Sequence, residues 1–166
     1  MTFAILYRPE LREYNFGSGH PFEGNRFAVF PDFLQQKLPQ GNNYRIITAN
    51  PATDEDLFLI CRKDYIDFTK EFFRAANLGT TSTDRFFQFH SGDNLPRARP
   101  GQIEEAARLI VGQAKRAVDI IQNGTFKKAV SIGGGLHHAR RAFGEGFCLY
   151  NDVAFTALYL LQQYGL

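Results

Sequence analysis

The sequence predicts an α/β fold with a mostly parallel sheet flanked by helices. Short apolar runs that suit buried strands alternate along the chain with segments in which apolar residues recur at helical spacing. No internal repeat or low-complexity segment interrupts this alternation. With 166 residues, 44% of them hydrophobic and 22% charged, the chain is expected to form one domain over residues 1–166.

Three apolar runs are expected to form the strands. The first covers residues 3–7 and ends at Arg8-Pro9, where proline favours entry into a loop. The second covers residues 44–48, and the third covers residues 129–132 and leads directly into three glycines.

Helices are expected between and after these strands. Around Pro31 the apolar spacing predicts two short helices or one kinked helix. The clearest helix covers residues 103–121, where isoleucines and alanines share one face and Asn123-Gly124 provides a stop. Other helices are expected to start at Thr53, to cover residues 64–76, and to cover residues 153–161 with Asn151 or Asp152 as the cap. Residues 79–100, rich in turn-forming residues, predict a long loop.

Charge and cysteine content narrow the classes of partner. The 19 basic and 17 acidic residues are scattered and leave a net charge of +2, which does not favour nucleic acid as a partner. The longest apolar run, residues 153–161, is too short to span a bilayer, so no membrane partner is expected. Cys61 and Cys148 lie far apart and indicate neither a disulfide framework nor a thiolate zinc site, which fits a cytoplasmic location.

The stretch SIGGGLHHARRAFGEGFCLYND, residues 131–152, holds the strongest candidate for a functional site. Ligands of open α/β sheets bind beyond the carboxyl ends of the strands, where the loop after Ile132 would hold His137 and His138. The glycines allow a ligand to approach the backbone, and adjacent imidazoles can face one pocket. Alternatively, the glycines only form a tight turn and the histidines are solvated. A phosphate-binding P-loop is disfavoured, because no Gly-Lys-Ser/Thr follows.

Cys148 has two interpretations. A cysteine within reach of a histidine can act as a nucleophile. Its neighbours Phe147 and Leu149 favour instead a small packed thiol. Acyl-enzyme chemistry at a serine is also disfavoured, because the sequence has no Gly-x-Ser-x-Gly elbow.

These motifs resemble the histone deacetylase superfamily, which includes bacterial acetoin-utilisation and acetylpolyamine deacetylases. GGGLHHARRAFGEGFCLYND resembles the family's Gly-Gly-x-His-His-Ala and Gly-Phe-Cys-x-x-Asn-Asp signature. GSGHPFEGNRF resembles its early Gly-x-Gly-His-Pro-Glu-x-x-x-Arg segment, and SGDNLP resembles its Gly-x-Asp-Asn-x-Pro loop. The resemblance spans residues 3–166 and implies the first half of an arginase/deacetylase-like fold.

The resemblance implies a zinc-dependent amidohydrolase that acts on an acetylated small molecule, such as an acetylpolyamine, or on an acetyl-lysine peptide. It also implies roles for six residues of this sequence: His137 and His138 as the general base and acid pair, Gly146 and Phe147 as the lining of a substrate tunnel, Asp93 as a carboxylate at the tunnel rim, and Arg26 beside an inner cavity.

The sequence departs from the family at the metal ligands. Full-length members supply these from an Asp-x-His pair and a later Asp, and they have a catalytic Tyr further on; no Asp-x-His occurs in these 166 residues. Phe22 and Gly24 also stand where the family commonly has Glu and Pro. Zinc is expected in the full-length family, but this chain is expected to hold no tightly bound metal, because two imidazoles supply too few ligands.

Two function classes follow from this pattern. The first is the N-terminal portion of a deacetylase-like hydrolase, either part of a longer enzyme or a shortened product, and inactive as an isolated chain. The alternative is a non-catalytic binding or assembly protein that retains half of the fold. The nearly all-apolar helix over residues 153–161 is expected to be buried by an unusual packing, by another copy of the chain in a homo-oligomer, or by a complementing C-terminal segment.

Overall fold

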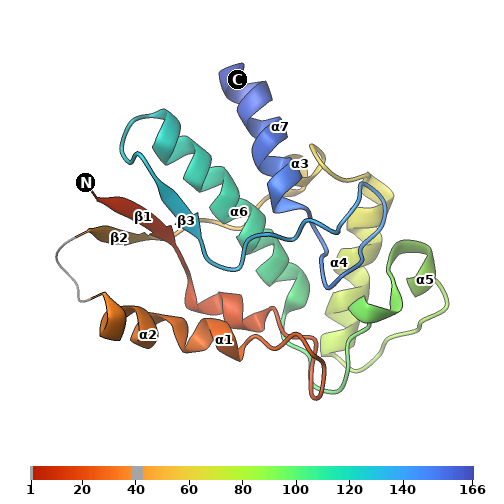
Figure 1. Ribbon diagram of the computed structural model, residues 1–166. Helices are drawn as coiled ribbons and strands as arrows, with labels where there is room; N and C mark the ends of the chain where they lie inside the picture. The colour runs from red at the N-terminus through yellow and green to blue at the C-terminus, as the bar shows by residue number, and fades with distance from the viewer. Residues whose placement is uncertain (1, 39–42) are drawn as a thin grey trace.

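A three-stranded parallel sheet forms the centre of the computed structural model, which describes residues 2–38 and 43–166. Strands β1 (Phe3–Leu6), β2 (Tyr44–Ile47) and β3 (Ala129–Ser131) lie in the order β2-β1-β3. Ala4 of β1 pairs with Ala129 of β3, so the sheet joins the N-terminal strand to a segment more than 120 residues later, while the C-terminus lies at the end of α7 (Figure 1). The predicted α/β class and the three predicted strands are confirmed.

The central strand is buried and the two outer strands are not. Ala4, Ile5 and Leu6 are at most 3% exposed, because helices and neighbouring strands cover both faces of β1. Val130, in the middle of β3, is 47% exposed. The β3 edge of the sheet therefore presents apolar side chains and unpaired backbone groups to solvent.

The longest helix, α6 (Ile103–Gln122), packs against the sheet and against α7 (Asp152–Tyr164) (Figure 1). Its predicted bounds are confirmed within one residue. At Gly112 the α6 backbone approaches the segment after β2 so closely that a Cβ would lie 1.9 Å from the Asn50 carbonyl oxygen. A glycine at this position permits the close contact between α6 and the end of β2.

The remaining helices are shorter than α6. The segment around Pro31 forms two helices, α1 (Asn25–Ala28) and α2 (Phe30–Lys37), and residues 9–13 form a 3₁₀ turn, η1 (Pro9–Glu13). Thr53 starts α3 (Asp54–Leu57) with a capping box, as its sequence predicts, but α3 is a single turn. The expected amphipathic helix over 64–76 is α4 (Lys63–Asn77).

The prediction of a long loop over residues 79–100 is wrong in part. This segment contains α5 (Phe86–Phe89) and a 3₁₀ turn, η2 (Gly92–Asn94). Phe89 stacks on Phe68 of α4 with ring centroids 4.5 Å apart, and Phe86 lies 4.6 Å from Phe72. Burial of these aromatic rings against α4 stabilises a helical turn, which the polar composition of the surrounding sequence does not predict.

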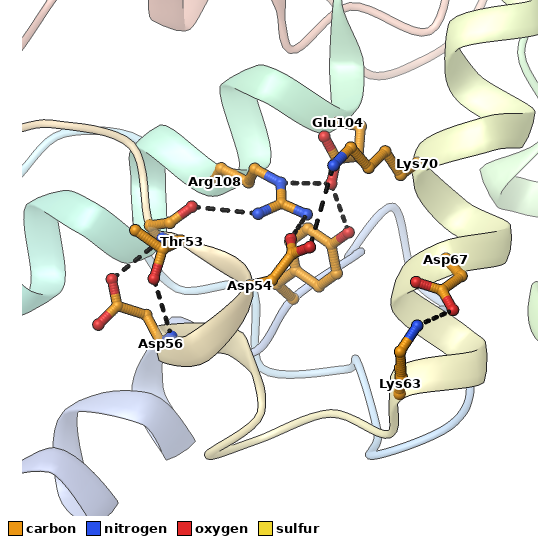
Figure 2. Close-up of polar contacts among 10 residues, drawn as sticks. Thr53, Asp54, Asp56, Lys63, Asp67, Lys70, Glu104 and Arg108 are labelled. Carbon is orange, nitrogen blue, oxygen red and sulfur yellow. Dashed lines mark hydrogen bonds and ion pairs between the residues drawn. The ribbon is translucent and has the colours of Figure 1, made fainter.

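A buried polar cluster joins α3, α6 and the segment before α7 (Figure 2). The Arg108 guanidinium donates from Nε to Glu104 Oε1 at 2.6 Å and forms an ion pair with Asp54 Oδ1 at 2.6 Å. The Tyr150 hydroxyl donates to the same Glu104 oxygen at 2.7 Å. Because α6 supplies both Glu104 and Arg108, this cluster ties three distant parts of the sequence together.

The apolar face of α7 lies largely in solvent. Phe155 is buried, whereas Val153 is 52% exposed and Leu161 is 58% exposed. Of the helices in the described part of the chain, none is long and apolar enough to cross a membrane.

Candidate active site

The loop after β3 carries the two adjacent histidines at the carboxyl end of the sheet. Gly133 and Gly135 adopt positive φ angles of 84° and 100°, which glycine reaches without strain. The loop then presents His137 and His138 on the surface, with ring centroids 4.2 Å apart and planes inclined by 39°. The two imidazoles therefore face the same space.

The protonation pattern of His137 follows from its partner. His137 Nδ1 lies 2.8 Å from the Gly135 carbonyl oxygen. A carbonyl oxygen only accepts hydrogen bonds, so Nδ1 carries the proton in this contact. In the neutral ring, Nε2 then has a free lone pair and can accept a proton.

A pocket of about 440 Å³ lies beside these imidazoles. Its lining comes from two parts of the chain, residues 22–27 and residues 133–148: Phe22, Arg26, Phe27, Gly133, Gly134, Gly135, Leu136, His137, His138, Gly146 and Cys148. The fold therefore brings together four of the six site residues that the sequence predicts: Arg26, His137, His138 and Gly146. Phe147 and Asp93 lie outside this lining but contact it.

Gly146 packs directly against the His138 ring. It has a φ of 60°, and a Cβ at this position would lie 2.7 Å from His138 Cδ2 and Cγ. Any larger residue would displace the imidazole. The next residue, Phe147, also has a positive φ of 65°, and Tyr14 donates to its carbonyl oxygen at 2.5 Å. A left-handed non-glycine residue is strained, and such residues concentrate at functional sites.

Asp93 contacts the backbone of Gly146. Its Oδ2 accepts a hydrogen bond from the Gly146 N–H at 2.7 Å, and its other carboxylate oxygen accepts one from the Ser91 hydroxyl. The Asp93 side chain is exposed. The carboxylate thus fixes the Gly146 backbone from the surface.

His20 is a site residue to which sequence reasoning assigned no role. It is buried, and its Nδ1 accepts from the Phe22 N–H at 3.0 Å, so Nε2 carries the proton donated to the Asp93 carbonyl oxygen at 2.9 Å. Its ring stacks on Phe16 at 4.7 Å and meets Phe147 edge-on at 5.0 Å. His20 therefore connects the backbone of Asp93 to the ring of Phe147. Its place in the GSGHPFEGNRF motif was the available signal.

Arg26 also lines the pocket. Its Nε donates to the Glu23 carbonyl oxygen at 3.0 Å, and its guanidinium lies 4.2 Å from the centroid of the Phe22 ring. Phe22, one of the two departures from the family's early motif, thus holds the arginine by a cation–π contact.

Cys148 has the environment of a packed thiol. It is buried, its Sγ donates to the Gly146 carbonyl oxygen at 3.3 Å, and burial raises the pKa of the thiol. A raised pKa reduces the thiolate fraction that a nucleophile needs. The geometry therefore favours the packing interpretation over nucleophilic attack.

Three buried tyrosines hold the segment that links Gly146 to α7. Tyr14 donates to the Phe147 carbonyl oxygen, Tyr65 donates to the Leu149 carbonyl oxygen at 2.6 Å, and Tyr150 donates to Glu104. Burial raises the pKa of all three tyrosines well above the ordinary value. The phenols therefore stay protonated donors.

The described side chains do not supply enough ligands for a zinc site. Catalytic zinc takes three protein ligands. Within residues 2–38 and 43–166, no group of three or more His, Cys, Asp or Glu side chains is placed to hold a metal ion. His137 also engages Nδ1 in its hydrogen bond to Gly135. Zinc is typical of the family to which the motifs point, but the residues described here do not fit it without further ligands.

The parallel sheet thus holds paired imidazoles at its carboxyl end, beside a pocket that Phe22 and Phe27 help to line. The domain model described as "Histone deacetylase domain" matches residues 20–166. This match covers most of the chain, and the chain belongs to the histone deacetylase family.

Relatives agree with this assignment. The chain is 35% identical over 165 residues to the acetoin utilization protein AcuC of Staphylococcus xylosus, covering 99% of this chain and 41% of that protein. It is 32% identical to AcuC of Bacillus subtilis (strain 168), covering 98% of this chain and 40% of that protein. The chain thus spans about two fifths of the length of these relatives.

The fold agrees with a solved structure. The crystal structure of a histone deacetylase homologue from Aquifex aeolicus superposes with a TM-score of 0.77 and 21% sequence identity. The match covers 99% of this chain and 42% of that one. The predicted portion of a deacetylase-like fold is confirmed.

Proposed function

We propose that this chain supplies the acid–base and substrate-channel portion of a hydrolase that removes acetyl groups from amines. Its substrate would be an acetyl-lysine peptide or an acetylated small molecule such as an acetylpolyamine. The observation that supports this proposal is the meeting of His137 and His138 with Arg26 and Gly146 around one pocket. Membership of the histone deacetylase family adds the reaction class.

The proposed roles follow from the two imidazole environments. His137 presents an unprotonated Nε2 and accepts a proton from water as the water oxygen bonds to the acetyl carbon. His138 donates a proton to the amine nitrogen as the carbon–nitrogen bond breaks, which releases acetate and the free amine. Phe147 lines the passage for the substrate chain, and Asp93 accepts hydrogen bonds from the substrate at the entrance.

The alternative function is non-catalytic binding or assembly. The exposed apolar face of α7 favours it, since such a face is typical of an interaction surface. Because the described residues hold no group of three metal-ligating side chains, the isolated chain is expected to hydrolyse no acetylated amine under either proposal.

The test uses a chimera in which residues 1–166 replace the matching two fifths of Bacillus subtilis AcuC. With zinc added, the chimera should hydrolyse an acetylated amine. Replacing His137 or His138 by Ala should lower the rate by roughly 10²- to 10⁴-fold, the usual contribution of a general acid or base. Replacing Cys148 by Ala is the matched control from the same pocket and should have a much smaller effect.

The intact AcuC protein controls for the assay, and circular dichroism controls for folding of each chimera. Hydrolysis that continues unchanged without His137 and His138 would refute their acid–base role. A folded, zinc-loaded chimera with no hydrolysis, beside an active AcuC control, would favour the binding function.

A further inference from the structure

The Asp152 carboxylate, in the first turn of α7, binds the backbone of the histidine loop. Oδ1 accepts from the Leu136 N–H at 2.7 Å, and Oδ2 accepts from the Gly135 N–H at 2.9 Å. The side chain is buried, so these charge-assisted bonds offset the cost of removing the carboxylate from water. A Cβ at Gly134 would lie 2.8 Å from Oδ2, which shows how closely the glycines wrap this carboxylate.

Asn151, the residue before it, binds the same loop at His137 and just after the histidine pair. Its Nδ2 donates to the carbonyl oxygens of His137 and Ala139, each at 3.0 Å. Its Oδ1 accepts from the Ala154 N–H at 2.8 Å and caps α7. Together, Asn151 and Asp152 hold backbone groups both before and after the imidazole pair.

The Asp152 carboxylate is not needed to cap its own helix. Asn151 already fills that position, and the Asp152 carboxylate points to the loop instead. Its partner Gly135 is also the residue whose carbonyl oxygen accepts from His137 Nδ1 at 2.8 Å. One glycine thus connects the buried carboxylate to the exposed imidazole.

We infer that Asp152, assisted by Asn151, is a positioning residue that selects the Nδ1–H tautomer of His137. By holding the Gly135 N–H, the carboxylate orients that residue so that its carbonyl oxygen faces Nδ1. The ring then presents Nε2 as the acceptor. The value of this selection for catalysis rests on the proposed acid–base role of His137, but the selection itself is a property of the chain alone.

The experiment measures the His137 tautomer in the ¹⁵N-labelled 166-residue chain by long-range ¹H–¹⁵N correlation at pH 8, with assignment by His137→Gln. The neutral ring should be mainly Nδ1–H. In Asp152→Asn the ratio of Nδ1–H to Nε2–H should fall about fivefold, the order of effect expected when one oriented hydrogen bond is lost. Asn151→Ser keeps a capping oxygen but removes both donated bonds, and should shift the ratio in the same direction.

Asp119→Asn is the matched control. The Asp119 carboxylate also holds α7, since it accepts from the hydroxyls of Tyr159 and Tyr164 at 3.0 Å, but it does not contact the loop. This variant should leave the ratio unchanged. If circular dichroism shows that Asp152→Asn is not folded, the tautomer ratio of Asn151→Ser is compared with that of the wild type instead.

Three results would overturn the inference: an Nε2–H ring in the wild-type chain, a ratio unaltered in the folded variants at positions 151 and 152, or an equal fall in Asp119→Asn. No hydrolysis is measured, so an inactive chimera would refute the proposed function and leave this inference standing.

Discussion

Replacement of Glu104 by Gln should lower the free energy of unfolding by more than the loss of an exposed charge would. The Glu104 side chain is 4% exposed, and its Oε1 accepts from both Arg108 Nε and the Tyr150 hydroxyl. Breaking a buried ion pair costs about 3–5 kcal/mol, because the remaining charge stays uncompensated. Asp54 still opposes the Arg108 guanidinium, which is 11% exposed, so the lower end of that range, about 3 kcal/mol, applies here.

Urea unfolding followed by circular dichroism at 222 nm measures this effect. In thermal unfolding of a domain of this size, a loss of about 3 kcal/mol in the free energy of unfolding corresponds to a fall in Tm of roughly 6–12 °C. Glu105→Gln is the matched control, because Glu105 is the next residue of α6 and is exposed; its effect should stay within about 0.5 kcal/mol. Equal midpoints for Glu104→Gln and Glu105→Gln, at unchanged m-values, would refute the reasoning.

Three further outcomes are expected. Burial acts to raise the pKa of Asp56, but the hydrogen bond from Lys115 Nζ at 2.5 Å has the larger effect, and the pKa is lowered. The Asp56 carboxylate therefore stabilises the fold above about pH 4, and this stabilisation is lost as the pH falls through the folded-state pKa. Unfolding free energies at pH 5 and pH 3 should differ less in Asp56→Asn than in the wild type, and an identical difference would contradict this. Equilibrium dialysis with elemental analysis should find well under one zinc per chain, and tight stoichiometric zinc would show that the donor set has been misjudged. Light scattering at micromolar concentration should show at least a dimer that covers Val130 and α7, whereas a clean 18.9 kDa monomer would count against that assembly.

Much of the fold could be predicted because its strands and long helices have clear periodic patterns. α6 shows this best: an apolar face, acidic residues at the start and Asn123-Gly124 at the end mark its bounds. α5 could not be predicted in the same way, because one turn is too short for a periodic signal. Phe86 and Phe89 form that turn only because α4 offers them an aromatic surface, which is a tertiary contact.

The candidate site likewise contains residues that a local sequence pattern could predict and contacts that no such pattern could predict. His137 and His138 could be singled out because a strand, three glycines and two histidines follow one another in sequence. The part played by Asn151 could be predicted only as a helix cap, since its donation to the His137 carbonyl oxygen depends on how the loop returns to α7. The contact between Asp93 and Gly146 likewise joins segments far apart in sequence, and no local pattern encodes it.

The order of the strands has a consequence for synthesis of the chain on the ribosome. β1 is made first and is the central strand, but its partner β3 begins only at Ala129. At about 5–20 residues per second, roughly 6–25 s pass before Ser131 follows Leu6 out of the peptidyl-transferase centre. During this interval the edge of β1 that pairs with β3 has no partner strand, and an unpaired edge of this kind is open to non-native pairing until β3 has been made.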